Sequence, residues 1–133
     1  MNAIQFQLRP VRSTKKETTV DRGKLPRITE VLALALQFED MIRRGLAKDY
    51  ADLARLGCLS KERISQIMRL IWLAPDLQQE VLMLPRTPRG RFPVNEVTLR
   101  GIASMMLWSE QRQRWEQLIT AAAGSGRVGG LTN

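Results

Sequence analysis

The sequence contains no histidine and only one cysteine, Cys58, among its 133 residues. Histidine is the commonest general base, the usual partner of a catalytic nucleophile and the commonest metal ligand. One cysteine cannot form an internal disulfide or a structural zinc site, and it fits a reducing cytoplasm. Because Cys58 falls in a short apolar turn, we expect it to be a small packing residue. We therefore expect neither an enzyme nor a bound metal or cofactor.

Aromatic residues and long apolar runs are also scarce, and aromatic residues make up only 5% of the chain. No run approaches the roughly 18 apolar residues that a membrane-spanning helix needs, so we expect no such helix. The first residues, MNAIQFQLRPVR, lack the charged and then apolar order of a secretory signal, which predicts a cytoplasmic protein. A hydrophobic content of 44% is sufficient for one small and mainly aliphatic core.

Positive charge is abundant, with a formal net charge of +8 and a pI of 10.8. Such a balance favours a polyanionic partner, nucleic acid first and an anionic membrane surface second. Residues 1–27 hold seven Lys or Arg against two acids, and residues 85–101 hold four against one, whereas residues 28–84 hold seven against eight. Basic segments around a nearly neutral body are typical of phosphate contacts, although they would also aid solubility. The candidate phosphate contacts in these segments are Arg9, Arg12, Lys15, Lys16, Arg86, Arg89 and Arg91.

The beginning of the chain has no helical periodicity. Residues 3–9 alternate apolar and polar side chains, which is the pattern of a β-strand. A lone strand is unstable in water, so this one must pair with a second copy, pair with a partner or stay disordered. Residues 1–26 as a whole are polar and basic, and we interpret them as a flexible arm with a possible short strand. A helix is predicted over 27–44, begun after Pro26 and ended by Gly45.

Residues 49–73, DYADLARLGCLSKERISQIMRLIWL, have the outline of a helix-turn-helix. A short helix over 49–56 stops at Gly57, and after a tight connection Ser60 opens a second amphipathic helix. In this motif the second helix lies in the DNA major groove. Ala54 is small where the two helices must approach each other. The apolar residues expected to share one core are Leu53, Leu56, Leu59, Ile64, Ile67, Met68 and Ile71.

The outer face of the second helix carries polar side chains that can form hydrogen bonds with base edges. The candidate base contacts are Ser60, Lys61, Glu62, Ser65, Gln66 and Arg69. Arg63 is a further candidate phosphate contact, and the alternative is that its position on the helix turns it toward a neighbouring side chain. The alternative interpretation is that this stripe is only the solvated side of a surface helix. Trp72, Trp108 and Trp115 each lie in an apolar helical stripe, so we expect them to pack rather than to stack on bases.

After the motif, the sequence predicts a short helix from Pro75 to Pro85 and then two more helices. Asn95 is a plausible cap for a helix over 96–107, and Ser109 for one over 110–122. The fold class is therefore predicted to be all-α, a helix-turn-helix bundle with a flexible basic arm and a small C-terminal helical unit. The predicted parts are the arm (1–26), the helix-turn-helix core (27–84), a basic linker (85–93), a C-terminal helical pair (94–123) and a disordered tail (124–133).

The segment MIRRGLAKDYADLA and the following LSKERISQIMRLIWLAPDLQQEVL resemble the DNA-binding domain of the plasmid-partition ParB/KorB family. The resemblance covers about residues 38–84. In the family the turn glycine occupies the position of Cys58, whereas here glycine comes one residue earlier, at Gly57. The chain has no counterpart of the family's N-terminal nucleotide-binding domain, so no CTP-dependent clamp is implied. The positions that match the family's recurring residues are Ala54, Leu59-Ser60, Ile64 and Leu73-Ala74-Pro75.

These features predict a sequence-specific double-stranded DNA-binding protein of the cytoplasm. The resemblance implies a regulator or accessory factor of a plasmid, phage or transposon, at a bacterial nucleoid. A second hypothesis is a protein-interaction adaptor that docks on a recombinase or another DNA-processing enzyme. RNA binding is a third, although the exposed aromatics and Gly-rich clamps of RNA modules are not evident. Since one helix-turn-helix contacts few base pairs, a homodimer is a candidate, through the strand at 3–9 or through Trp108–Ile119.

Overall fold

The computed structural model describes residues 23–131, with side chains up to 123. This part of the chain is all-α, as the sequence predicts, and its six α-helices and one 3-10 helix leave only an isolated β-bridge between Lys24 and Thr87. The predicted strand at 3–9 and the arm up to residue 22 lie outside the described residues. The elements are α2 (Arg27–Arg43), α3 (Tyr50–Gly57), α4 (Lys61–Met68), η2 (Arg69–Trp72), α5 (Pro75–Leu82), α6 (Glu96–Ala103) and α7 (Trp108–Leu131).

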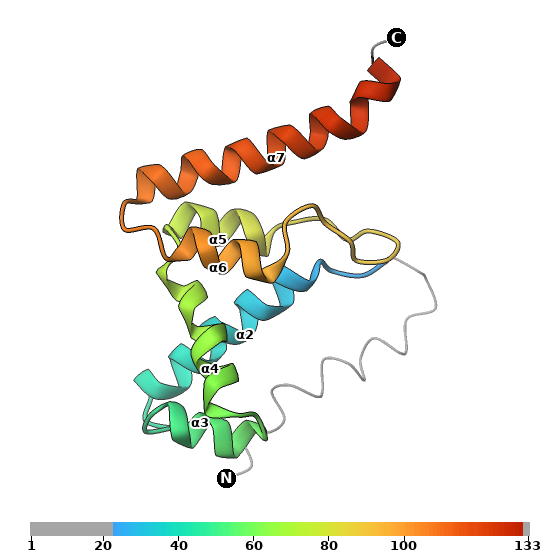
Figure 1. Ribbon diagram of the computed structural model, residues 1–133. Coiled ribbons are helices and arrows are strands. Elements are labelled where there is room, and N and C mark those ends of the chain that lie inside the picture. The colour runs from blue at the N-terminus through green and yellow to red at the C-terminus, as the bar shows by residue number, and fades with distance from the viewer. Residues whose placement is uncertain (1–22, 132–133) are drawn as a thin grey trace.

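The helices are stacked from one end of the molecule to the other (Figure 1). Helices α3 and α4 form one end, α5 and α6 lie in the middle, and α7 crosses over them at the opposite end. Helix α2 runs through the body and contacts α4, α5, η2 and α6. This arrangement leaves α3 and α4 at an end that α7 does not cover.

Helix α2 is the centre of the core, because its apolar residues surround most of its circumference. It begins after Pro26, whose ring fixes φ at −59°, and it ends before Gly45, which has a φ of 80°. Thr29 donates a hydrogen bond to the Val81 carbonyl at 2.7 Å and ties α2 to α5. The buried apolar residues of α2 are Ile28, Val31, Leu32, Ala35, Phe38 and Met41.

A single hydrophobic core includes both the predicted motif region and the predicted C-terminal pair. Leu99 and Ile102 of α6 and Trp115 of α7 belong to the same buried cluster as α2 and α4. Phe92, in the segment predicted to be a linker, stacks on Trp115 with ring centroids 6.2 Å apart. The C-terminal helices are therefore part of the same body as residues 27–84, because their apolar stripes have no other surface to cover.

The boundaries of the last two helices differ from the prediction. Helix α6 ends at Ala103 rather than 107, and the Ser104 hydroxyl bonds to the Gly101 carbonyl at 2.7 Å. Helix α7 starts at Trp108, before the predicted cap Ser109, because the Leu107 carbonyl accepts the first helical bonds. It continues to Leu131 instead of ending at 122. No proline follows residue 93, and the run Ala121–Ala123 strongly favours helix.

The tryptophans also depart in part from the prediction. Trp115 is buried, with 1% of its surface exposed, whereas Trp72 is 66% and Trp108 49% exposed. Trp72 lies in η2, whose 3-10 winding turns about 120° per residue instead of about 100° in an α-helix. The change of winding after Met68 rotates Trp72 away from the buried stripe that a continuous α-helix would place it on. None of the helices in residues 23–131 is long and apolar enough to cross a membrane.

Candidate nucleic-acid interface

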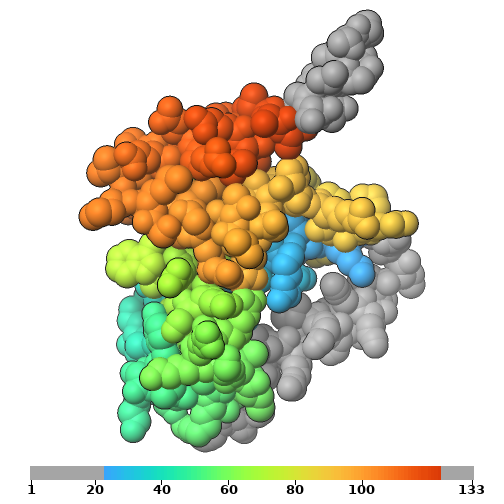
Figure 2. Space-filling model, in the orientation of Figure 1, coloured from blue at the N-terminus to red at the C-terminus, as the bar shows by residue number. Residues whose placement is uncertain are grey.

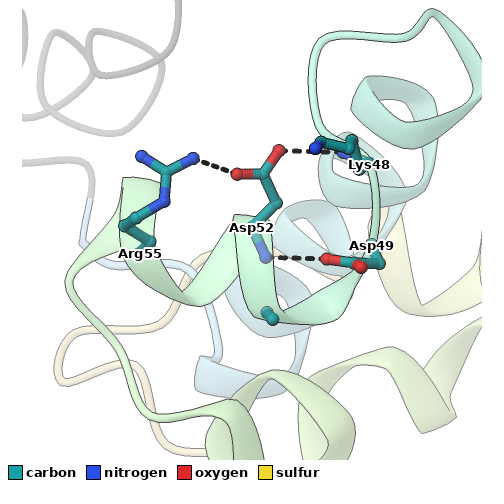
Figure 3. Close-up of a pocket in the computed structure, with 5 residues that line it drawn as sticks. Lys48, Asp49, Asp52 and Arg55 are labelled. Atoms are coloured by element: carbon teal, nitrogen blue, oxygen red, sulfur yellow. Dashed lines mark hydrogen bonds and ion pairs between the residues drawn. The ribbon is translucent and has the colours of Figure 1, made fainter.

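Helix α3 is begun by a pair of aspartates. The Asp49 carboxylate accepts a hydrogen bond from the Asp52 backbone N–H at 2.9 Å, and the Asp52 carboxylate accepts one from the Lys48 backbone N–H at 2.9 Å. Asp52 also pairs with Arg55. Figure 3 shows these side chains around an open hollow at the start of α3. The hydrogen bond from Lys48, followed by the pair with Arg55, lowers the pKa of Asp52, so this carboxylate stays ionised and caps the helix.

The turn between α3 and α4 depends on a left-handed residue. Cys58 ends α3 with φ 55° and ψ 43°, a conformation that glycine adopts most easily. This is the position at which the resemblance to the ParB/KorB family expects glycine. Gly57, in contrast, is the last helical residue, and a Cβ there would meet only the Leu59 side chain at 3.8 Å. The conformation of the turn is thus the one that a glycine at 58 would favour, although the residue differs.

Helix α4 is fixed by its cap and by its buried face. Ser60 is the N-cap, and its Oγ accepts a hydrogen bond from the Arg63 backbone N–H at 2.9 Å. Ile64, Ile67 and Met68 are buried against α2 and α3. The other apolar residues that the sequence assigns to this core are either buried or packed against it: Leu53, Leu56, Leu59 and Ile71.

The predicted base contacts lie on the opposite side of α4. Lys61, Glu62 and Arg69 are exposed, and their side chains form no hydrogen bond or ion pair within the described residues. Ser65 and Gln66 are half-buried, and Gln66 accepts a hydrogen bond from Arg63 through Oε1 at 3.0 Å. Arg69 belongs to η2 rather than to α4, directly after the helix end. The structure therefore brings these residues together on one face, with Ser60 at its N-terminal edge.

Arg63 is not free for a phosphate. Its guanidinium donates two hydrogen bonds to Glu96, one from each terminal nitrogen, at 2.5 and 3.0 Å. Arg100 donates to the same carboxylate at 2.6 Å. The hydrogen bond from Arg63 is the main cause that lowers the pKa of Glu96, and Glu96 in turn raises the pKa of Arg63. The sequence left two partners open for Arg63, a phosphate or a neighbouring side chain. In the structure its partner is a neighbouring side chain, that of Glu96.

The segment 85–93 is attached to the start of α2. Lys24 and Thr87 exchange two backbone hydrogen bonds, at 2.8 and 2.9 Å, and Arg86 donates to the Gly23 carbonyl at 3.3 Å. A Cβ at Gly23 would lie 2.6 Å from the Thr87 carbonyl oxygen, so this close approach requires glycine. Figure 2 shows the yellow loop projecting beside the blue residues that precede α2.

Arg86, Arg89 and Arg91 are exposed on this loop, as expected for phosphate contacts. Lys24, which pairs with Thr87 of this loop, adds a fourth exposed basic side chain. The other four candidate phosphate contacts, Arg9, Arg12, Lys15 and Lys16, lie outside the described residues.

The structure contains two features that the sequence analysis did not predict: a buried glutamine and an exposed apolar patch. Gln111 is 1% exposed, accepts a hydrogen bond from the Ala74 backbone N–H, and donates to the carbonyls of Trp72, Ala103 and Met105. It lies four residues before buried Trp115, on the same helical face, which is the signal that sequence analysis could have used. The two segments that Gln111 joins carry four exposed large apolar side chains, which we call the apolar patch: Trp72, Met106, Leu107 and Trp108.

No group of three His, Cys, Asp or Glu side chains in the described part of the chain is placed to hold a metal ion. The carboxylates with resolved shifts, Asp40, Asp52, Asp76 and Glu96, all have lowered pKa values because arginines or backbone N–H groups bind them. A general acid or base needs a pKa near the working pH, and these groups are shifted away from it. Comparison of the chain with protein-family models, with curated proteins and with solved structures returns no match.

Proposed function

We propose that this protein is a sequence-specific double-stranded DNA-binding protein that places α4 in the major groove. The observation that carries the proposal is the division of α4 into two faces. Its inner face is buried, which fixes the helix. The outer face of α4 presents Lys61 and Glu62, and the η2 turn that follows adds Arg69, all without a partner among the described residues. A helix held in this way, at an end of the described residues that α7 does not cover, can enter the groove as a rigid element.

The charge distribution supports a duplex partner. The net charge of +8 favours a polyanion, and the exposed arginines of the loop 85–93 are available for phosphate contacts. We include Arg9, Arg12, Lys15 and Lys16 among the phosphate contacts. Each phosphate contact that is removed is expected to flatten the log–log salt dependence of binding by about 0.9. Loop or arm variants that leave this slope unchanged would assign those residues to solubility.

The biological context is proposed from the resemblance to the ParB/KorB DNA-binding domain. We propose a transcription regulator, or an accessory factor of DNA recombination, that serves a plasmid, phage or transposon at the bacterial nucleoid. The support is the series of matching positions around the two helices, together with the left-handed turn at Cys58. No nucleotide cofactor enters this proposal.

The direct test of the proposal is substitution on the outer face of α4. Gln66→Ala or Arg69→Ala is expected to weaken binding to the preferred duplex by about 1–3 kcal/mol and to relax base choice at one position. Gln79→Ala on α5 and Arg114→Ala on α7 are matched controls on exposed residues and should leave binding unchanged. Equal losses on preferred and random duplexes would show phosphate contact only, and unchanged binding would overturn the docking of α4.

The apolar patch favours a further partner. One α4 contacts few base pairs, so we propose that two copies of the chain meet through this patch and bind two half-sites. Gln111 donates to the backbone carbonyls of Trp72 and Met105, which brings the segment of Trp72 next to the turn that carries Met106, Leu107 and Trp108. Contact between two copies at this patch would bury apolar rather than charged side chains.

The second candidate function uses the same patch differently. An adaptor would present it to a recombinase or another DNA-processing enzyme, and the exposed Trp72 and Trp108 favour this reading because aromatic residues are enriched at protein interfaces. An adaptor would be monomeric on its own and would bind random and specific duplexes alike. Molecular mass and base preference therefore separate the two candidates.

A further inference from the structure

We propose that Glu96, a residue of α6 outside the candidate base-contacting helix, sets the base specificity of α4. It does so by holding Arg63 away from phosphates and, through Arg63, by orienting Gln66. This inference rests on the DNA-binding function proposed above and assigns a positioning role within the same site.

The contacts form one chain that crosses from α6 to α4. Arg100 and Arg63 both donate to Glu96, and Arg63 donates through the same NH1 nitrogen to Gln66 Oε1 at 3.0 Å. The side chains are shielded, with 19% of Arg100, 14% of Glu96 and 27% of Arg63 exposed. A shielded network of charge-assisted hydrogen bonds is stronger than an exposed ion pair and holds its members in one geometry.

The first consequence concerns charge. A guanidinium binds phosphate through two parallel N–H donors, and Glu96 occupies one donor on each terminal nitrogen of Arg63. Arg63 is thereby withdrawn from the sequence-independent part of DNA binding. Because Glu96 neutralises one of two arginines, α4 meets the duplex with less positive charge than its sequence suggests. Less affinity for random DNA then leaves a larger share of the binding energy to base contacts.

The second consequence concerns Gln66. A free glutamine amide can rotate and offer either its oxygen or its NH2 group to a base edge. Here Oε1 accepts from Arg63, which directs the Nε2 donors away from that contact and toward a partner outside the network. We therefore expect Gln66 to select an acceptor edge in the major groove, such as guanine O6 or N7 or thymine O4.

The experiment measures binding of the full chain to its preferred duplex and to random duplex over a range of salt concentrations. Glu96→Gln removes the charge that holds Arg63. The ratio of preferred to random affinity is expected to fall about tenfold, within the range for one lost base contact, and the random-duplex slope should steepen by about 0.9 as Arg63 reaches a phosphate. Glu116→Gln removes the same charge from an exposed position on α7 and should change neither quantity.

A second variant separates the two consequences and keeps the test open if Glu96→Gln fails to fold. Arg63→Met removes the guanidinium but keeps an unbranched apolar stem, so the affinity ratio should fall while the salt slope does not steepen. An unchanged ratio in folded Glu96→Gln or Arg63→Met protein would overturn the inference and leave the network a structural one. A wild-type chain that shows no preferred duplex at all would instead overturn the proposed function, and the inference with it.

Discussion

At the scale of single residues, Cys58 is the clearest point of conformational strain. It is the only non-glycine residue with positive φ in the part of the chain that the structure describes. We expect Cys58→Gly to raise the free energy of unfolding by roughly 0.5–1 kcal/mol, because relief of left-handed strain exceeds the entropy that glycine adds to the unfolded chain. Urea unfolding measures this. Gly57→Ala, the control beside it, should cost little, and a destabilising Cys58→Gly would contradict the assigned turn.

Gln111 is the residue on which the arrangement of α5, α6 and α7 depends most. Its side chain accepts from the Ala74 N–H and donates to the Trp72 and Met105 carbonyls, with a longer contact of 3.5 Å to the Ala103 carbonyl, and only 1% of it is exposed to water. Since a buried polar group without a partner costs about 1–3 kcal/mol, Gln111→Leu is expected to lower the free energy of unfolding by at least about 3 kcal/mol. Gln113→Leu, two residues along on the exposed side, should stay within about 0.5 kcal/mol. Similar losses for both variants in chemical unfolding would contradict this role.

At the scale of elements, the ion pair between α4 and α6 makes stability depend on acid pH. The pKa of Glu96 in the folded chain lies below its ordinary value of 4.5, mainly because of the hydrogen bond from Arg63. A lowered folded pKa means that the ionised form is favoured by folding, so the contribution is complete above the unfolded pKa. It is lost as pH falls below about 4.5 and through the folded pKa.

The variant Glu96→Gln should therefore lose stability near neutral pH and show a shallower decline on acidification. Thermal unfolding between neutral pH and pH 3 checks this, with Glu116→Gln as the matched control. Part of the decline will remain, because Asp40, Asp52 and Asp76 also have lowered pKa values. Identical pH profiles for the wild type and Glu96→Gln would contradict a stabilising ion pair.

The elements differ in how well their sequence predicted them, for local reasons. Helices α2, α3 and α4 carry their own signals, namely Pro26, the caps Asp49 and Ser60, and a regular apolar period, and the prediction was right to within a residue or two at most of these ends. The end of α6 and the start of α7 differ from the prediction because Gln111 bonds to the carbonyls of Ala103 and Met105 in the turn between them, which no local rule describes. The pair of Arg63 with Glu96 joins residues 33 positions apart, and neither residue signals the other.

The residues of the candidate site also differ in how well the sequence predicted their positions. Helical spacing alone predicts one shared outer face for Lys61, Glu62 and Arg69, and all three are exposed in the structure. The hydrogen bond to the Gln66 side-chain oxygen could not be predicted, because Arg63, which donates it, is held by Glu96 of α6. The exposure of Trp72 could not be predicted from apolar periodicity, because that pattern does not signal the switch to a 3-10 helix after Met68.

At the scale of the whole molecule, the uneven charge and the apolar patch predict self-association through one surface. We expect light scattering at micromolar concentration to give a dimer, twice the chain mass of 15.2 kDa. Met106→Glu, a change at a side chain that is 90% exposed in the patch, should reduce the mass to that of one chain, since a charge there would have to be buried. Met83→Glu makes the same change at a 72% exposed position outside the patch and should leave the dimer intact. A monomeric wild type would favour the adaptor function instead.

The central claim is that α4 selects a base sequence, and selection of bound fragments from random duplex DNA tests it most directly. The account predicts enrichment of a short motif by the wild-type chain, in two symmetric copies about one helical turn apart if the protein is a dimer. It also predicts that Arg69→Ala loses the preference at one position of that motif while Arg114→Ala keeps it. Recovery of fragments with no shared motif, at an affinity that depends only on salt, would contradict the claim.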